Sequence, residues 1–452
     1  MKPTQAASNR GGRSWSHQLQ ERYALHFDAC LAEWFDSGGW QLAGRGEFNQ
    51  PVSPEVLLAE NPEVLWPALM LPDSLPVLGN RKGDWLCLRI GSDSAIAEVI
   101  HWYHGGGDWI PWGRTLAEAI VFDSLHDRLP GRNHAHAVAA EPRRAGDGEG
   151  ALVRWASDWL PSEVRTALGS ASFPELVEIL LEHRVSEVGL RSELVLAALD
   201  SGLRRWLTPE IAAELGIPWE PDAVSWLFDT ALVDEASRSE LRRSIGGELD
   251  FSQDWQGAAK HAAAVCRERG DLGWAFDVAG WAAEREGNVA EAAEYYRRGA
   301  VALAFADQSI RFRTHWFPPA KGKFSLWRLE VLESQRRIEI AEKPGAGSPK
   351  PDEIDGYLQA IAGGESGGAS AGTLRSRAAD YWRSVALTAT EQGRPADAYE
   401  AHYRAGWDLG LEELGSYRQR LASLVEAAEK AGQLGRARVA QAHLDTFLHR
   451  FG

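Results

Sequence analysis

Two kinds of hydrophobic pattern divide the first third of the chain. From Trp15 to Asp36 apolar residues recur every three or four positions, which predicts an amphipathic helix. The segment Trp85 to Ile90 alternates instead, so that successive side chains face opposite sides, as in a strand. A second strand is predicted from Glu98 to Tyr103, after the polar turn Gly91 to Ser94. The short turn between them predicts an antiparallel hairpin.

The flanks of this hairpin carry helix and turn signals. Ser53-Pro54-Glu55 has a capping hydroxyl followed by Pro, which predicts a short helix to Asn61. Trp109 to Trp112 is an extended aromatic segment. Thr115 then caps a predicted helix that continues to Leu125 with apolar residues at helical spacing. The whole region is therefore predicted to be an α+β domain, an antiparallel sheet with flanking helices.

This succession resembles the SUKH superfamily, the Smi/Knr-type domain, over about residues 20–127. The resemblance lies in Leu75-Pro76, the turn Gly79-Asn80 to Gly83-Asp84, the paired strands and the closing helix. It implies a domain that binds another protein. In bacteria it implies an immunity protein that blocks the active site of a toxin. Families of this type often have an acidic residue near the end of the first strand, where this chain has Arg89.

The rest of the chain is predicted to be all α. Three segments predict pairs of antiparallel helices with small residues at the crossing and Gly at the turn, which resembles a degenerate tetratricopeptide repeat. They are Gly273 to Leu303, Tyr381 to Gly406, and a weaker one around Gly432. The turn Gly residues are spaced irregularly, which favours separate helical hairpins over a regular array.

The predicted organisation has five parts. A polar disordered tail and a SUKH-like α+β domain are followed by a linker rich in Pro and Gly, a helical domain and a helical-hairpin region. Two segments of the last part are rich in Gly and Ser and are expected to be mobile. The five parts are, in the same order, residues 1–14, 15–129, 130–150, 151–250 and 251–452. The two mobile segments are residues 343–350 and 363–372.

Composition narrows the class of partner. The chain has 452 residues and a net charge of −16, which argues against nucleic acid, because phosphate binding needs clustered Lys and Arg. An acidic surface suits solubility or a basic protein partner, and with the toxin that the resemblance implies it suggests a basic toxin. No long apolar run suggests a membrane span. Three separate cysteines and the lack of a signal peptide predict a reduced, cytoplasmic protein.

The chain has 20 Trp, most of which are expected to fill cores. Trp and Tyr are also favoured at interfaces, which makes aromatic residues the candidate binding groups. The hypothesis is partner binding by the N-terminal domain, without catalytic residues, metal or cofactor. A scaffold or regulator that binds through the helical repeat region is the alternative within the binding class. The candidate partner-binding residues are Trp85, Trp102, Tyr103, Asp108, Trp109 and Trp112.

An enzyme is the second class of function. His101, His104 and Asp108 are residue types that ligate zinc or transfer protons, but their spacing on a strand and its end fits a preformed site poorly. Gly105-Gly106-Gly107 lacks the Lys-Ser/Thr that follows a phosphate-binding loop. Asp84 is predicted to be a turn residue whose side chain bonds backbone amides.

Overall fold

The structure is a computed structural model, and it describes most of the chain. Described are residues 13–126 except 43, 45, 67–69 and 105–107, and residues 150–199, 254–303, 323–334, 353–362, 371–409 and 414–452, with a few single positions between 210 and 243. The predicted tail up to residue 12, the linker 130–149, the helices expected between 200 and 253, and the mobile segments 343–350 and 363–370 lie outside the described residues.

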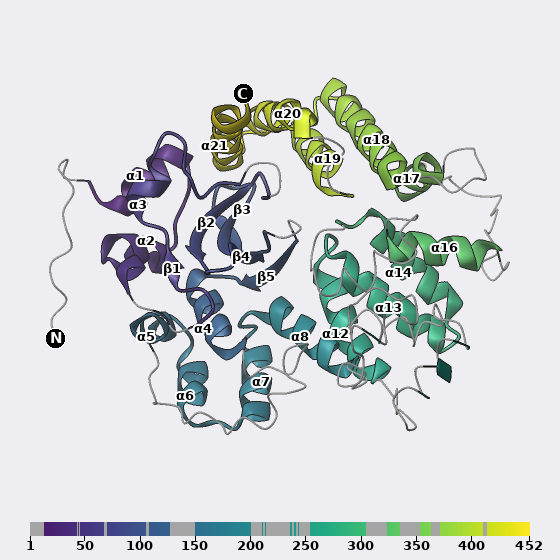
Figure 1. Ribbon diagram of the computed structural model, residues 1–452, viewed down its shortest axis with the longest axis horizontal. Helices are drawn as coiled ribbons and strands as arrows, with labels where there is room; N and C mark the ends of the chain where they lie inside the picture. Colours follow the sequence, from purple (N-terminus) through teal and green to yellow (C-terminus); the bar gives the residue numbers. More distant parts are fainter. Residues whose placement is uncertain are drawn as a thin grey trace. The chain divides into compact units, whose positions relative to one another are not determined.

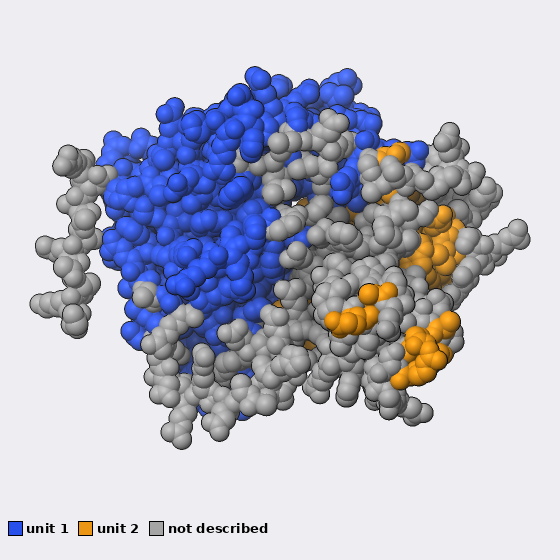
Figure 2. Space-filling view, viewed as in Figure 1, with its two compact units in different colours: residues 1–127, 142–190, 375–452 blue, residues 128–141, 191–374 orange. Residues whose placement is uncertain are grey.

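Two compact units make up the chain (Figure 2). The first combines residues 1–127, 142–190 and 375–452, and the second residues 128–141 and 191–374. The first unit therefore joins segments that the sequence analysis assigned to three different domains. The boundaries at 129 and 150 follow composition, whereas the units follow contacts between residues that are hundreds of positions apart.

A five-stranded antiparallel sheet forms the centre of the first unit, and its strands follow one another in chain order (Figure 1). The predicted hairpin is confirmed, with Cys87 opposite Ile100 and Arg89 opposite Glu98. The Leu75-Pro76 segment and the aromatic segment at Trp109 are also strands, which the sequence analysis had not paired with the hairpin. The five strands are β1 Gln50–Pro51, β2 Ser74–Gly79, β3 Trp85–Ile90, β4 Ile96–Trp102 and β5 Trp109–Gly113.

One helix had been predicted from Trp15 to Asp36, but the structure has two, α1 Trp15–Tyr23 and α2 Ala29–Asp36. Ala24 takes a left-handed backbone conformation with φ of 52°, which ends α1. His26 then pairs with Ala95 beside the sheet, and the Asp28 carboxylate accepts the Leu31 N–H to start α2. The apolar spacing continues across the break because both helices pack on the same core.

Helix α4, Leu116–His126, covers one face of the sheet. Its start is the predicted one, because the Thr115 hydroxyl accepts the Glu118 N–H at 3.2 Å. Trp112 on β5 packs edge-on against Phe122 of α4, with ring centroids 4.7 Å apart. Helix α3, Pro54–Leu57, has the predicted Ser53 start but ends at Leu57 and not at Asn61 as predicted. The other helices of this region are the 3-10 turn η1 Gly39–Gln41 and, after the linker, α5 Ala151–Asp158, α6 Ser162–Ser170, α7 Phe173–Glu182 and α8 Glu187–Ala198.

The second half of the chain is all helical in its described part, as predicted. The crossing of α13 and α14 is as close as the small residues indicated, since a Cβ on Gly280 would lie 2.5 Å from the Tyr296 ring. The helices are α12 Trp255–Glu268, α13 Gly273–Arg285, α14 Val289–Val301, α16 Phe324–Ser334, α17 Glu353–Ala362, α18 Ala371–Glu391, α19 Pro395–Trp407, η5 Leu414–Ser416, α20 Tyr417–Lys430 and α21 Leu434–Phe451. Residues 371 and 372, expected to be mobile, begin α18.

Three helical hairpins have the same type of turn. The pairs α13/α14, α18/α19 and α20/α21 are each joined by three residues, and the middle one is a Gly with positive φ: Gly287, Gly393 or Gly432. In each turn the N–H of the next residue donates to a carbonyl five positions back, for example Gln433 to Ala428 at 2.9 Å. This is the Schellman closure of a helix end. The weakest of the three candidate hairpins is therefore as regular as the others.

Candidate protein-interaction site

The sheet face opposite α4 carries a row of three Trp residues. Trp85 lies directly across from Trp102, and Trp102 across from Trp109, so the three side chains share one face. Trp102 and Trp109 are fully buried, and Trp85 is half-buried. Cross-strand aromatic neighbours stabilise a sheet by packing, so this row is part of the core. Trp102 and Trp109 do not form a surface that a partner could contact in this structure.

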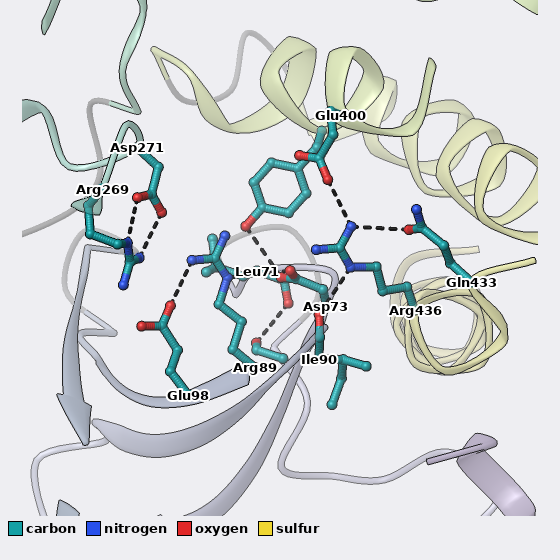
Figure 3. Close-up of polar contacts among 12 residues, drawn as sticks. Leu71, Asp73, Arg89, Ile90, Glu98, Arg269, Asp271, Glu400, Gln433 and Arg436 are labelled. Carbon is teal, nitrogen blue, oxygen red and sulfur yellow. Dashed lines mark hydrogen bonds and ion pairs between the residues drawn. The ribbon is translucent and has the colours of Figure 1, made fainter. Parts of the chain in front are cut away.

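A buried charged cluster lies next to this row, and Figure 3 shows its members. Arg89 on β3 bonds to Glu98 Oε1 at 2.9 Å and to Asp73 Oδ2 at 3.4 Å. Its guanidinium also stacks on Trp109 at 4.6 Å from the ring centroid. Because Asp73 is almost completely inaccessible, its charge is compensated inside the protein. Arg89 therefore has a structural role here.

Helices from the C-terminal end of the chain complete this cluster (Figure 3). The Tyr403 hydroxyl of α19 donates to Asp73 Oδ1 at 3.3 Å. Arg436 of α21 donates from Nε to the Ile90 carbonyl at 3.0 Å and pairs with Glu400 of α19 at 2.8 Å. The end of β3 is thus held between its own sheet and two helices that follow it by more than 300 positions.

Two further contacts join α21 to the sheet. The Gly435 N–H donates to the Ser94 hydroxyl at 2.9 Å, and the His443 Nε2 lies 3.0 Å from the Ser74 carbonyl oxygen of β2. A Cβ on Gly435 would lie 3.0 Å from Leu25 and Ser94, so the helix approaches the β3–β4 turn closely. We call the contacts of α19 and α21 with Asp73, Ser74, Ile90 and Ser94 the sheet–helix junction.

Burial sets the protonation states at the sheet–helix junction. It raises the pKa of Tyr403 well above the ordinary value, and the neighbouring Asp73 adds to this effect, so Tyr403 remains a hydrogen-bond donor. Burial opposes the charge of Arg436, but Asp73, Tyr399 and Glu400 outweigh it and raise the pKa of that guanidinium. Burial lowers the pKa of His443 to about 4, so its ring is neutral at pH 7.

The other candidate residues lie in the core or at its edge. Trp112 is buried on the α4 face, where its ring meets the edge of the His101 ring at 4.9 Å. Tyr103 is half-buried and stacks on His101 with centroids 3.8 Å apart. Asp108 is buried at the start of β5, and its carbonyl accepts the Tyr103 N–H at 2.7 Å. These residues are therefore no more surface-exposed than the Trp row.

The histidines of the predicted alternative site have separate surroundings. His104 is exposed and its Nδ1 lies 3.0 Å from Asp84 Oδ1, which also accepts the His104 N–H. Burial raises the pKa of Asp84, but hydrogen bonds from His104 and Asn80 outweigh it and the pKa is lowered. Asp84 thus accepts a backbone amide, as predicted, but that of His104; within its own turn the Asn80 side chain accepts the Lys82 and Asp84 N–H groups. Within the described ranges no three His, Cys, Asp or Glu side chains are placed to hold a metal ion. Gly105 to Gly107 lie outside those ranges.

Sequence reasoning missed the residues of the sheet–helix junction. Arg436 and His443 are two helical turns apart, which places both on the same face of α21 among apolar residues. A polar pair inside an apolar stripe indicates a buried contact, so this spacing was the available signal. What the pair contacts could not be read from the sequence.

No protein-family model matches the chain, and comparisons with curated proteins and with solved structures found no match. In the part of the chain that the structure describes, no helix has the length and apolar character needed to span a membrane.

Proposed function

We propose that this chain is a non-enzymatic protein-interaction protein that binds its partner through its helical hairpins. The observation that carries the proposal is Leu387 on α18 of the hairpin α18/α19, a large apolar side chain that is 61% exposed. Helical hairpins of this kind commonly present such faces to other proteins. A large apolar side chain exposed on a helix is suited to anchor a partner.

The burial of the Trp-rich sheet face also favours the hairpins as the binding surface. That face was the first candidate surface, but Trp102 and Trp109 are buried and the adjacent cluster is closed by Tyr403. A partner would have to displace the chain's own helices to reach it. The three free, buried cysteines support the proposed cytoplasmic location, since thiols stay reduced there.

In-cell photocrosslinking tests the proposal. A benzophenone amino acid would replace Leu387 on α18 and, as the matched control, Trp159 beyond α5, which is 37% exposed. We expect one defined protein adduct at position 387, absent at position 159 and suppressed by excess unlabelled chain or by Leu387→Asp. Equal adducts at both positions would contradict hairpin binding. So would the lack of any adduct at position 387 that excess unlabelled chain suppresses.

An immunity role is the second candidate, favoured by the net charge of −16 and by the meander of strands closed by α4. It requires a basic toxin as partner. If a toxin gene lies beside the gene for this chain, co-expression of the two should restore growth that the toxin alone arrests. Failure of rescue with both proteins present at measured levels would reject immunity and leave the hairpin proposal intact.

A further inference from the structure

His443 is the histidine of the sheet–helix junction. Its side chain is completely buried on α21, and the Ser74 carbonyl oxygen beside Nε2 can only accept a hydrogen bond. Nε2 therefore carries the proton of the neutral ring. Nδ1 is buried and has no hydrogen-bond partner among the described residues. A second proton on this ring would place a positive charge in the junction without an acceptor at Nδ1.

The charged groups around His443 come from each element packed there. Asp73, next to Ser74, is the charge that acts on His443 and favours its protonation, but burial opposes protonation more strongly. Asp73 is itself engaged by Arg89 of β3 and Tyr403 of α19. Arg436 on α21 pairs with Glu400 of α19. On the outlying helices, Arg420 of α20 donates to the Ala405 carbonyl and Arg22 of α1 to the Ala59 carbonyl.

The remaining contacts of α21 with the sheet do not change charge in mild acid. Gly435 donates to a Ser94 hydroxyl, and Arg436 donates from its guanidinium to the Ile90 carbonyl. Both contacts engage backbone or hydroxyl groups, which do not titrate between pH 4 and 7. His443 is thus the group through which pH acts directly on the attachment of α21 to β2.

We propose that the sheet–helix junction is a pH-sensitive latch, in which protonation of His443 releases α21 from the sheet and uncovers the buried end of β3. Release would expose Ser94 and the Ser74 carbonyl while the sheet itself stays folded and Tyr403 of α19 still covers Asp73. The latch stands on the geometry of the junction and holds whether or not the hairpins bind a partner.

The direction in which pH shifts the docking of α21 follows from the two pKa values of His443. Docked His443 takes a proton only near pH 4, whereas in the released helix it would take one near the ordinary value of 6.5. Between these values the released state binds more protons, so a fall in pH favours release. Docking is fully present above pH 6.5. At pH 5 the docking equilibrium should be weaker by roughly thirtyfold than at pH 7.5.

Thiol labelling of the full chain measures this release. Ser94→Cys places a thiol under α21, because Ser94 is buried there. In a second variant, Ser92→Cys at the exposed neighbouring position gives the alkylation rate of an unprotected thiol at each pH. Cys30 of α2 is buried elsewhere in the same unit and reports its unfolding. We expect the alkylation rate of position 94, divided by that of position 92, to rise roughly thirtyfold from pH 7.5 to 5. Cys30 should stay protected.

Two His variants test whether His443 causes the pH dependence of labelling. In the Ser94→Cys background, His443→Gln keeps a side-chain N–H but cannot be protonated, and should remove the pH dependence. His402→Gln is the matched control, because burial also lowers the pKa of His402 on α19 but the junction does not include it. The control should keep the full pH response.

Several results would overturn the latch. Labelling that does not change between pH 7.5 and 5 would do so, as would labelling of Cys30 in step with position 94, which signals unfolding. An unchanged pH response in His443→Gln would assign the effect to another group. Should that variant fail to fold, the pH profile of Ser94→Cys with His443 in place still decides. Release by one proton requires its labelling ratio to rise by about 0.85 decade per pH unit between about pH 6 and 4.5.

Discussion

At the scale of single residues, buried charges hold this protein together in places where the sequence looks ordinary. Arg89 shares one face of its strand with Trp85 and Cys87, and nothing in that pattern distinguishes it from a solvent-facing residue. In the structure it contacts two carboxylates and an aromatic ring. Removing such a group leaves its partners buried and uncompensated, which is more damaging than losing the interaction itself.

Arg89→Ala should therefore destabilise the first unit by about 3 kcal/mol, because Asp73 would remain buried with less compensation for its charge. Urea unfolding followed by Trp fluorescence measures this loss. The matched control is Lys82→Ala, since Lys82 is 74% exposed in its pair with Glu47 and should change stability by less than about 0.5 kcal/mol. Equal effects of the two substitutions would show that the cluster does not stabilise the fold.

Gly280 is a second residue whose importance depends on its neighbour. Gly280→Ala should destabilise the second unit by about 1–3 kcal/mol, because the new methyl group would overlap the Tyr296 ring. Gly169→Ala on α6 is the control, since no atom lies within 4 Å of its Cβ position and Ala favours a helix by roughly 0.5–1 kcal/mol. Chemical denaturation of both variants compares them. A neutral Gly280→Ala would mean that the two helices can separate slightly without loss.

At the scale of elements, the turns of the helical hairpins are the most regular feature of the chain. The same hydrogen-bond closure recurs at Gly287, Gly393 and Gly432, each with positive φ. The sequence predicted these turns because a Gly after a helical apolar pattern has few other roles. The sequence did not predict the turn at Ala24, where a residue other than Gly takes positive φ and divides the predicted first helix.

Gly393→Ala tests the turn geometry alone, because its Cβ would meet no atom within 4 Å. Holding Ala at a φ of 68° should destabilise the hairpin by about 1–2 kcal/mol. Gly415→Ala, at a position with equally open space and no positive φ, should have almost no effect. Thermal unfolding by circular dichroism compares the two. A similar drop in melting temperature for both would mean that the turn tolerates a left-handed Ala without strain.

At the scale of the whole molecule, the first unit is built from three distant segments. Its sheet is completed by helices from the opposite end of the chain, through contacts such as Tyr403 with Asp73 and His443 with Ser74. Such a unit cannot be divided at the predicted linker without breaking its core. The linker signal in residues 130–150 is a feature of composition and does not report which segments pack together.

A fragment of residues 1–190 should therefore be less stable than the first unit in the full chain by at least about 3 kcal/mol, because Asp73 and Arg89 lose their helical partners. It should also bind the hydrophobic dye ANS, since the side chains under α19 and α21 become exposed. Urea unfolding and dye fluorescence measure both effects against the full chain. A fragment as stable as the full chain, without dye binding, would show that the C-terminal helices contribute little.

The sequence by itself determined the local elements of this protein. Alternation gave the β3–β4 hairpin, Thr115 the start of α4, and Gly the hairpin turns, because each depends on residues close together in the chain. Tertiary structure alone decided that Trp102 and Trp109 are core residues and that α21 closes the sheet. Strand and helix periods show which side of an element is apolar. They do not specify which distant surface covers that side, and here that surface is the chain's own C-terminal helices.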